Sequence, residues 1–381
     1  MADPLRLLFL TQCPPSLELG GSKSQLELAA ELEPLGWHCR VVGPDASGIA
    51  APAELLAEPW DVVDWDIHLA VPRSALPQGA LSIARIPFLN LHLRGGRLPW
   101  PLGRWRWRRR AQHLLRCWRG GNSEIQELAD AQARVRRALD QADALNTWNS
   151  ADTRLLIEQE GVATDRLIEL PPGLTETRLQ ELAAVAEQRI SKPNTRRPRL
   201  VVLATFDFRK GCLDLPHLLA QVRRRHPSLQ LRLLGTRGLF RSEAEVRRFF
   251  PGFLQEALEV VPSFNAAELP AWLADADLGL FPSYLEGFGI AVIEQLAAGL
   301  PVFAYDVPGP CDSLPAEWRV PRGHQQQLAA RIHAFLEQPP ALRLQARQQA
   351  RERAQAYSLG PLAVRWDQFY RQRLSQLRPS R

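Results

Sequence analysis

Short apolar runs alternate with amphipathic segments along the chain. Leu5–Thr11 is apolar, a loop with prolines and glycines follows it, and Ser22–Leu35 repeats apolar residues at helical spacing before the next apolar run, His38–Val42. Apolar runs without internal alternation are typical of strands buried on both faces of a parallel sheet. Further runs of this kind lie at Val62–Ala70, Phe88–Leu93 and Ala142–Asn146. The alternation predicts a doubly wound α/β domain.

The same pattern restarts after a polar break. The segment Arg189–Arg199 carries two prolines and has no periodicity, so we expect the interdomain linker there. Beyond it, strands are predicted at Leu200–Thr205, Leu229–Gly235, Leu258–Val261, Leu278–Pro282 and Pro301–Ala304. Helices are predicted at Asp214–Arg225, Ala266–Ala274 and Ile290–Ala298.

Two such halves predict two Rossmann-like, doubly wound domains that face each other across a cleft. We place the first domain at residues 1–188 and the second at 198–357. The segment 358–378 has Leu362, Trp366, Phe369 and Tyr370 on one stripe, which predicts an amphipathic helix that joins the first domain. A chain of 381 residues is long enough for two cores of ordinary size.

Composition narrows the class of protein. Apolar residues make up 45% and charged residues 23% of the chain, which is typical of a folded globular protein. No apolar run approaches the length of about 20 residues that a membrane span needs. The N-terminal residues lack the pattern of a cleaved signal peptide, and the five cysteines are scattered without metal-ligand spacing. We therefore expect a cytoplasmic protein with free thiols.

The segment 281–306 carries the clearest chemical signal. Its sequence, FPSYLEGFGIAVIEQLAAGLPVFAYD, predicts a strand, a loop with Gly287 and Gly289, and a helix from Ile290. The first N–H groups of a helix, reached through glycines, form a site suited to a diphosphate. Glu286 precedes that helix and Glu294 lies about one turn inside it. Carboxylates accept hydrogen bonds from the paired hydroxyls of a sugar or a ribose.

A second signal follows the first strand of the second half. The segment Thr205–Gly211, TFDFRKG, places Arg209 and Lys210 at the carboxyl edge of the predicted sheet, where open α/β folds bind ligands. A lysine ammonium at this edge is a point charge for a phosphate. Lysine is rare in this chain, because nearly all of the 47 basic residues are arginine.

Together these motifs resemble the family 4 retaining glycosyltransferases of GT-B fold. The resemblance rests on Glu286-x7-Glu294, preceded by Pro282-Ser283 and followed by Gly299-x-Pro301-Val302. Outside this signature, the matching motifs are Gly20-Gly21, Ala142-Asp143-Ala144 with Ser150, Pro172-Gly173 and Arg209-Lys210-Gly211. The segment TFDFRKG most resembles the members that build lipopolysaccharide cores, which indicates a role in cell-envelope polysaccharide synthesis.

The resemblance implies a role for each matching residue. The donor would be bound by Gly20, Gly21, Arg209, Lys210, Glu286, Phe288, Gly289, Ile290 and Glu294. Glu294 would hold the ribose, Glu286 the sugar at its reacting end, and Lys210 the diphosphate leaving group. His92 falls where the family has a histidine, so Glu286, Lys210 and His92 are the catalytic candidates.

The chain departs from the family pattern in two places. A second cation usually lies five or six residues before the lysine, where this chain has Ala204 and Thr205. Either Arg209 or Arg237 supplies that charge instead, or the diphosphate geometry differs. The acidic residue that usually follows the histidine is Leu93 here.

The implied activity is retaining transfer of a sugar from a nucleoside diphosphate sugar to a hydroxyl acceptor, which is a glycan, a glycolipid or a small molecule. We expect no metal and no cofactor, because the helix start and Lys210 supply the positive charge. The pairs Asp64/Asp66 and Asp275/Asp277 imitate a metal motif, but we interpret them as loop or helix-end residues. Two alternatives keep the donor pocket: a GT-B-like sugar-nucleotide epimerase and an inactive sugar-nucleotide-binding protein.

The formal net charge of +6 favours an anionic partner. Residues 100–119 contain four tryptophans and seven arginines, a mixture that suits an anionic lipid interface. An ordinary helix of the first domain, with its tryptophans in the core, is the alternative. We therefore predict peripheral contact with an anionic membrane through 97–119. Nucleic acid is not an expected partner, since no nucleic-acid-binding motif accompanies the charge.

Overall fold

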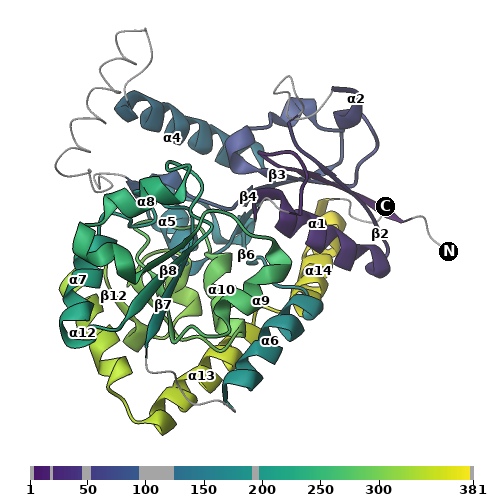
Figure 1. Cartoon of the computed structure of the whole chain (residues 1–381). Coiled ribbons are helices and arrows are strands. Elements are labelled where there is room, and N and C mark those ends of the chain that lie inside the picture. Colours follow the sequence, from purple (N-terminus) through teal and green to yellow (C-terminus); the bar gives the residue numbers. More distant parts are fainter. Residues whose placement is uncertain (1–3, 18–19, 45–52, 94–123, 191–196, 378–381) are drawn as a thin grey trace. The chain divides into compact units, whose positions relative to one another are not determined.

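The computed structural model describes residues 4–17, 20–44, 53–93, 124–190 and 197–377 (Figure 1). The described residues form two compact units. Unit 1 contains the residues up to His92, the residues from Glu124 to Thr175, and the C-terminal residues from Ser358. Unit 2 contains Glu176–Tyr357.

Unit 1 is built on a parallel sheet of six strands in the order β2-β1-β3-β4-β5-β6. The strands are β1 (Leu5–Leu10), β2 (Trp37–Val42), β3 (Val62–Asp66), β4 (Leu81–Ile86), β5 (Ala144–Thr147) and β6 (Leu167–Glu169). Its helices are α1 (Gly20–Leu32), α2 (Ala53–Leu56), α4 (Glu124–Gln141), α5 (Ser150–Glu160) and α14 (Leu359–Leu377).

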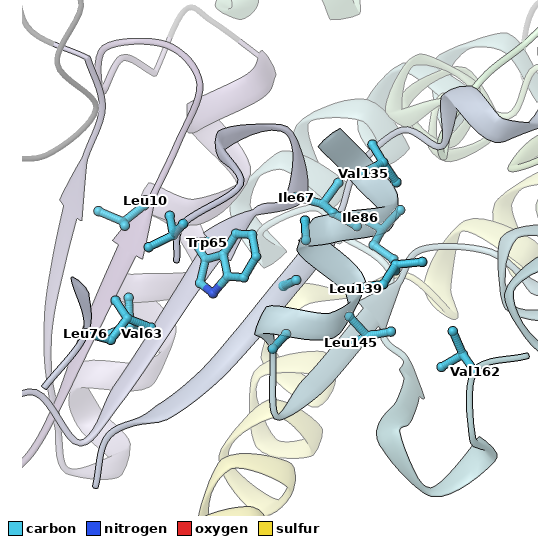
Figure 2. Close-up of a cluster of buried hydrophobic side chains, with 14 of the residues drawn as sticks. Leu10, Val63, Trp65, Ile67, Leu76, Ile86, Val135, Leu139, Leu145 and Val162 are labelled. Carbon is cyan, nitrogen blue, oxygen red and sulfur yellow. The ribbon is translucent and has the colours of Figure 1, made fainter. Parts of the chain in front are cut away.

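One core of unit 1 packs around Trp65 of β3 (Figure 2). Strand residues such as Leu10 and Ile86 meet Val135 and Leu139 of α4 there, and all of them are buried. The strands are apolar on both faces because a second core covers the other side of the sheet.

Helix α14 joins that second core through both apolar and polar contacts. Leu362, Trp366, Phe369 and Tyr370 are all buried, as the predicted stripe requires. The Tyr370 hydroxyl donates a hydrogen bond of 2.9 Å to Asp64, which also pairs with Arg85 of β4. Burial raises the pKa of the Asp64 carboxyl, and the pairing with Arg85 opposes that shift.

Unit 2 contains a second parallel sheet, with the strand order β12-β11-β10-β7-β8-β9. The strands are β7 (Arg199–Leu203), β8 (Gln230–Leu234), β9 (Leu258–Val261), β10 (Leu278–Phe281), β11 (Val302–Asp306) and β12 (Arg319–Pro321). The helices are α6 (Glu176–Ile190), α7 (Leu215–Arg225), α8 (Glu243–Phe249), α9 (Leu269–Leu273), α10 (Ile290–Ala297), α11 (Pro310–Ser313), α12 (Gln325–Leu336) and α13 (Pro340–Gln355).

The predicted strand at Phe88–Leu93 was wrong. The fourth strand of unit 1 is β4, Leu81–Ile86, and a 3-10 turn over Asn90–Leu93 follows it. Polar Ser82 and Arg85 interrupt the apolar pattern of β4, yet both are buried, because Ser82 accepts from Trp65 and Arg85 pairs with Asp64. Buried polar pairs of this kind cannot be recognised from local hydrophobicity.

The division of the chain also differs from the expected one. Helix α6 was expected in the first domain, but it belongs to unit 2, where it contacts α9, α10 and α13. The expected linker began at Arg189, which lies within α6. The chain therefore passes between the units near Thr175 and Glu176.

Of the two acidic pairs, Asp66, Asp275 and Asp277 lie at the expected loop or helix-end positions, and Asp64 does not. Asp64 is a fully buried residue of β3 and not a loop residue, while Asp66 caps a short 3-10 turn and pairs with His68 at 2.9 Å. Asp275 pairs with Arg232 at 2.6 Å, and Asp277 accepts from the backbone N–H of Arg199 at 2.8 Å. Within the part of the chain that the structure describes, no helix is long and apolar enough to cross a membrane.

Candidate functional site

Two loops meet at the carboxyl edge of the second sheet. Strands β7 and β10 are parallel neighbours, so the loops that follow them leave the sheet side by side. The Tyr284 N–H donates to the Arg209 carbonyl at 2.8 Å. Gly211 has a positive φ of 79°, and a Cβ added there would lie 2.0 Å from the Pro282 carbonyl oxygen. Glycine is therefore required for the contact that joins the two loops.

The contact brings two cations onto one carboxylate. The Lys210 Nζ lies 2.5 Å from Glu286 Oε1, and the Arg209 Nη1 lies 3.3 Å from the same oxygen. Arg209 also donates to the Leu285 carbonyl at 3.0 Å. Glu286 is 6% exposed, so its charge depends on these partners rather than on water.

The two cations keep Glu286 ionised. Burial acts to raise the pKa of its carboxyl, but the charges of Lys210 and Arg209 outweigh burial and lower the pKa below its ordinary value. The site therefore presents a carboxylate and not a carboxylic acid at neutral pH.

Helix α10 begins directly after this carboxylate. Gly289 caps the helix with a left-handed φ of 86°, which glycine adopts without strain. The backbone of Gly309 packs closely against the preceding residue, Phe288. A Cβ at Gly309 would lie only 2.5 Å from the Phe288 carbonyl oxygen. The N–H groups at the start of α10, near Ile290, thus open beside Glu286, where they favour an anion.

Glu294 lies one turn into α10 and has a partner that the sequence pattern did not indicate. Its Oε1 accepts from Arg178 Nη2 at 3.1 Å. Arg178 belongs to α6, is nearly buried and also pairs with Glu181 at 3.2 Å. Because 116 positions separate Arg178 from Glu294, no local motif could have revealed the pair.

A buried carboxyl group, that of Asp214, anchors the loop that carries Glu286. Asp214 accepts from the hydroxyls of Tyr284 at 2.8 Å and Tyr305 at 2.5 Å. Burial raises the pKa of Asp214, and the two tyrosine hydrogen bonds oppose that shift. Tyr284 lies two residues before Glu286, so these hydrogen bonds restrict the loop that carries the carboxylate.

Two candidate residues of unit 1, Gly20 and Gly21, lie at the start of α1. Gly20 and Gly21 were expected in a loop before a helix at Ser22, but α1 begins at Gly20. A Cβ at Gly21 would lie 3.1 Å from Cys13 Sγ, and the Ser22 hydroxyl donates to the Pro14 carbonyl at 3.0 Å. These contacts fold the loop after β1 onto the first turn of α1.

His92 has an acidic partner from a distant element. Its Nε2 lies 2.6 Å from Oδ1 of the fully buried Asp152, which Asn149 also contacts. In the tautomer with the proton on Nε2, His92 donates to Asp152 and its Nδ1 is left as a hydrogen-bond acceptor. The family usually has an acidic residue directly after the histidine, at the position of Leu93. In this chain the acidic residue that contacts His92 is Asp152.

The remaining candidates are placed as follows. Arg209 lies in the charged cluster, whereas Arg237 is an exposed residue after β8. The predicted membrane-contact segment 97–119 lies outside the described residues.

Two parallel six-stranded α/β units, the second with cations and a carboxylate at its carboxyl edge, define a protein of GT-B fold. Residues 185–355 match the family model of the glycosyl transferases group 1, so unit 2 is a domain of that family. This match agrees with the predicted glycosyltransferase family over the matched residues.

Known proteins resemble the chain in sequence and in fold. A D-inositol 3-phosphate glycosyltransferase from Nocardia farcinica is 30% identical over 176 residues, which cover 44% of this chain and 39% of that protein. A sucrose-phosphate synthase from Thermosynechococcus elongatus has the same fold, with a TM-score of 0.72, 20% identity, and coverage of 98% of this chain and 100% of that one. The Anabaena protein Alr3699/HepE, solved with UDP and glucose, has a TM-score of 0.61 at 15% identity over 96% of this chain and 99% of that one.

The structural likenesses confirm the predicted GT-B fold. The sequence alignments cover less of each protein than the structural ones do. The region aligned with the Nocardia relative spans about two fifths of that protein.

Proposed function

We propose that the chain transfers a sugar from a nucleoside diphosphate sugar to a hydroxyl acceptor, with retention of configuration and without a metal. The observation that carries the proposal is the buried Glu286 carboxylate, which lies between Lys210 and Arg209 beside the start of α10. The family of unit 2 and the UDP-bound and glucose-bound state of a protein of similar fold support it.

Glu286 and Lys210 stabilise opposite charges at the bond that breaks. Both cations contact Oε1 of Glu286, so Oε2 accepts hydrogen bonds from the sugar, and the carboxylate stabilises the positive charge that grows on the sugar ring. A lysine ammonium has several N–H donors. Lys210 uses one for Glu286 and directs the others to the diphosphate, whose negative charge grows as it leaves. The backbone of Phe288, Gly289 and Ile290 binds the remaining phosphate oxygens.

Glu294 binds the ribose hydroxyls of the donor. Arg178 holds one of its oxygens and orients the carboxylate, which leaves the other oxygen for the ribose. The roles that the resemblance implies for Gly20, Gly21 and His92 of unit 1 stay predictions.

A panel of UDP-, GDP- and ADP-sugars tests the proposal. Release of the diphosphate with an acceptor mixture supports sugar transfer, an altered sugar indicates an epimerase, and binding without either reaction indicates an inactive sugar-nucleotide-binding protein. The Lys210→Ala variant should lower kcat by about 10²–10³-fold, as removal of one preorganised donor does. Exposed Arg241→Ala is the matched control. An unchanged kcat in Lys210→Ala would refute the assigned role.

We further propose that the acceptor is a glycan or glycolipid of the cell envelope and that 97–119 attaches the cytoplasmic protein to an anionic membrane. Each arginine near such a surface contributes about 1 kcal/mol, within a Debye length of about 8–10 Å. Flotation should show binding to anionic but not zwitterionic vesicles. High salt, or changing Arg108, Arg109 and Arg110 together to serine, should reduce it. If anionic vesicles fail to bind the protein at low salt, the membrane role is wrong.

A further inference from the structure

Three potential metal ligands converge where α7 and α12 end. The two helices contact each other in unit 2 and are seen side by side in Figure 1. His226 caps the C-terminus of α7, Glu337 caps that of α12, and His333 lies one turn before Glu337. One ligand atom from each residue lies within 4.8 Å of the others. The spacing of His333 and Glu337 places both side chains on one face of α12.

The ring nitrogens of this cluster lack ordinary partners. Nε2 of His226 and Nδ1 of His333 are buried without a hydrogen-bond partner, and His333 is only 8% exposed. Glu337 Oε1 lies 3.8 Å from His226 Nε2, which is too far for a hydrogen bond. Buried polar atoms are nearly always satisfied, so two unsatisfied nitrogens on residues grouped with one carboxylate indicate a missing ligand.

The two histidine rings also lie against each other. They stack with centroids 5.3 Å apart. An imidazole binds a metal through the lone pair of one ring nitrogen.

The cluster lies at the edge of the sheet opposite to Glu286. Helices α7 and α12 follow the parallel strands β7 and β12 and run back along the sheet, so their C-termini lie at its amino edge. The Glu286 loop follows β10 and lies at the carboxyl edge. Helix C-termini carry partial negative charge, which favours a cation. Arg225 competes for Glu337 at 3.7 Å, but both side chains are about half exposed or more, so that pair is weak.

We propose that His226, His333 and Glu337 bind one Zn²⁺ ion at the amino edge of unit 2, apart from the sugar-transfer site. Two imidazoles and a carboxylate are ligands that Zn²⁺ accepts at about 2.0–2.2 Å, with water in the fourth position. The ligand atoms must approach one another for this geometry, and the half-exposed Glu337 side chain can rotate to do so. The bound ion ties the ends of α7 and α12 together and stabilises unit 2.

The test uses the full chain after chelator treatment and dialysis. Titration with Zn²⁺ against a chromophoric chelator should show one tight site per chain, and Zn²⁺ should raise the thermal midpoint. His226→Gln and Glu337→Gln should each weaken binding by at least about tenfold, the smallest loss typical even of residues that only support a ligand. Circular dichroism checks that these part-exposed variants fold.

His217→Gln is the matched control, because His217 is an exposed histidine on α7 that contacts Gln221 instead of the cluster. It should bind Zn²⁺ as the wild type does. Absence of a tight stoichiometric site in the wild type would overturn the proposal. So would binding that His226→Gln and Glu337→Gln leave unchanged, because the ion would then lie elsewhere.

Discussion

At the scale of single residues, the ionisation of Glu286 determines whether its ion pairs with Lys210 and Arg209 persist. The pKa of this carboxyl is lowered from 4.5 because Lys210 and Arg209 outweigh the effect of burial. Ionised Glu286 therefore contributes stability above about pH 4.5, and the contribution is lost as the pH falls through the lower pKa of the folded state.

The difference in the free energy of unfolding between wild type and Glu286→Gln should therefore be largest at neutral pH and shrink below about pH 4.5. Urea unfolding at a series of pH values measures it. Glu317→Gln, at an exposed carboxylate, corrects for general acid effects. A difference that grows toward acid pH would contradict the assigned direction.

Arg178 and Glu294 should act as one unit in donor binding. Glu294→Ala should weaken binding of the nucleotide sugar by about 1.5–3 kcal/mol, the range for hydrogen bonds to charged groups. Arg178→Met should also weaken it, because Glu294 would lose the cation that orients it. A double-mutant cycle should give a coupling of about 0.5–3 kcal/mol. Additive losses, measured by calorimetry with the donor, would show that Arg178 does not position Glu294.

At the scale of elements, the contact between the loops after β7 and β10 assembles the cluster. Gly211→Ala should destabilise the protein by more than the about 1 kcal/mol that a left-handed backbone alone costs, because its Cβ would lie 2.0 Å from the Pro282 carbonyl. It should also reduce turnover, since Lys210 and Glu286 lie on the two loops.

Gly161→Ala is a close control for this prediction. Gly161 also has a positive φ, 68°, but an added Cβ would meet nothing within 4 Å. Unfolding free energies and turnover of both variants separate the clash from the backbone effect. Equal losses in the two variants would show that the loop contact is not required.

Most elements follow from the sequence, and the exceptions have physical causes. Strands β7, β9 and β10 and helix α7 were predicted to within two residues, because each is a compact apolar or amphipathic segment between breakers. Strand β4 was missed because Ser82 and Arg85 are buried through hydrogen bonds and an ion pair. Helix α6 was assigned to the wrong domain because periodicity predicts a helix but not the sheet that it covers.

At the scale of the whole molecule, metals should matter for stability and not for turnover. Lys210, Arg209 and the start of α10 already supply positive charge for a diphosphate. Excess EDTA should therefore leave most of the sugar-transfer activity while lowering the thermal midpoint. Activity lost at once, well below that midpoint, and restored by Mg²⁺ or Mn²⁺ would contradict metal independence. Loss that follows unfolding and is reversed by Zn²⁺ would be a stability effect.

The sequence by itself determined the two α/β sheets and the local order of the site. Hydrophobic periodicity predicts strands and helices, and Glu286, Gly289 and Glu294 lie within one loop and one helix, so their spacing already places them together. Lys210 was predicted at the same sheet edge because parallel strands end there.

Only the tertiary structure decided which partners these residues have. Asp152 lies 60 positions from His92, Arg178 lies 116 from Glu294, and Tyr370 lies 306 from Asp64. The histidine cluster likewise joins the ends of two helices about a hundred residues apart in sequence. Short-range patterns report which face of an element is buried, but the packing of distant elements determines which charges meet, because an ion pair depends on separation in space.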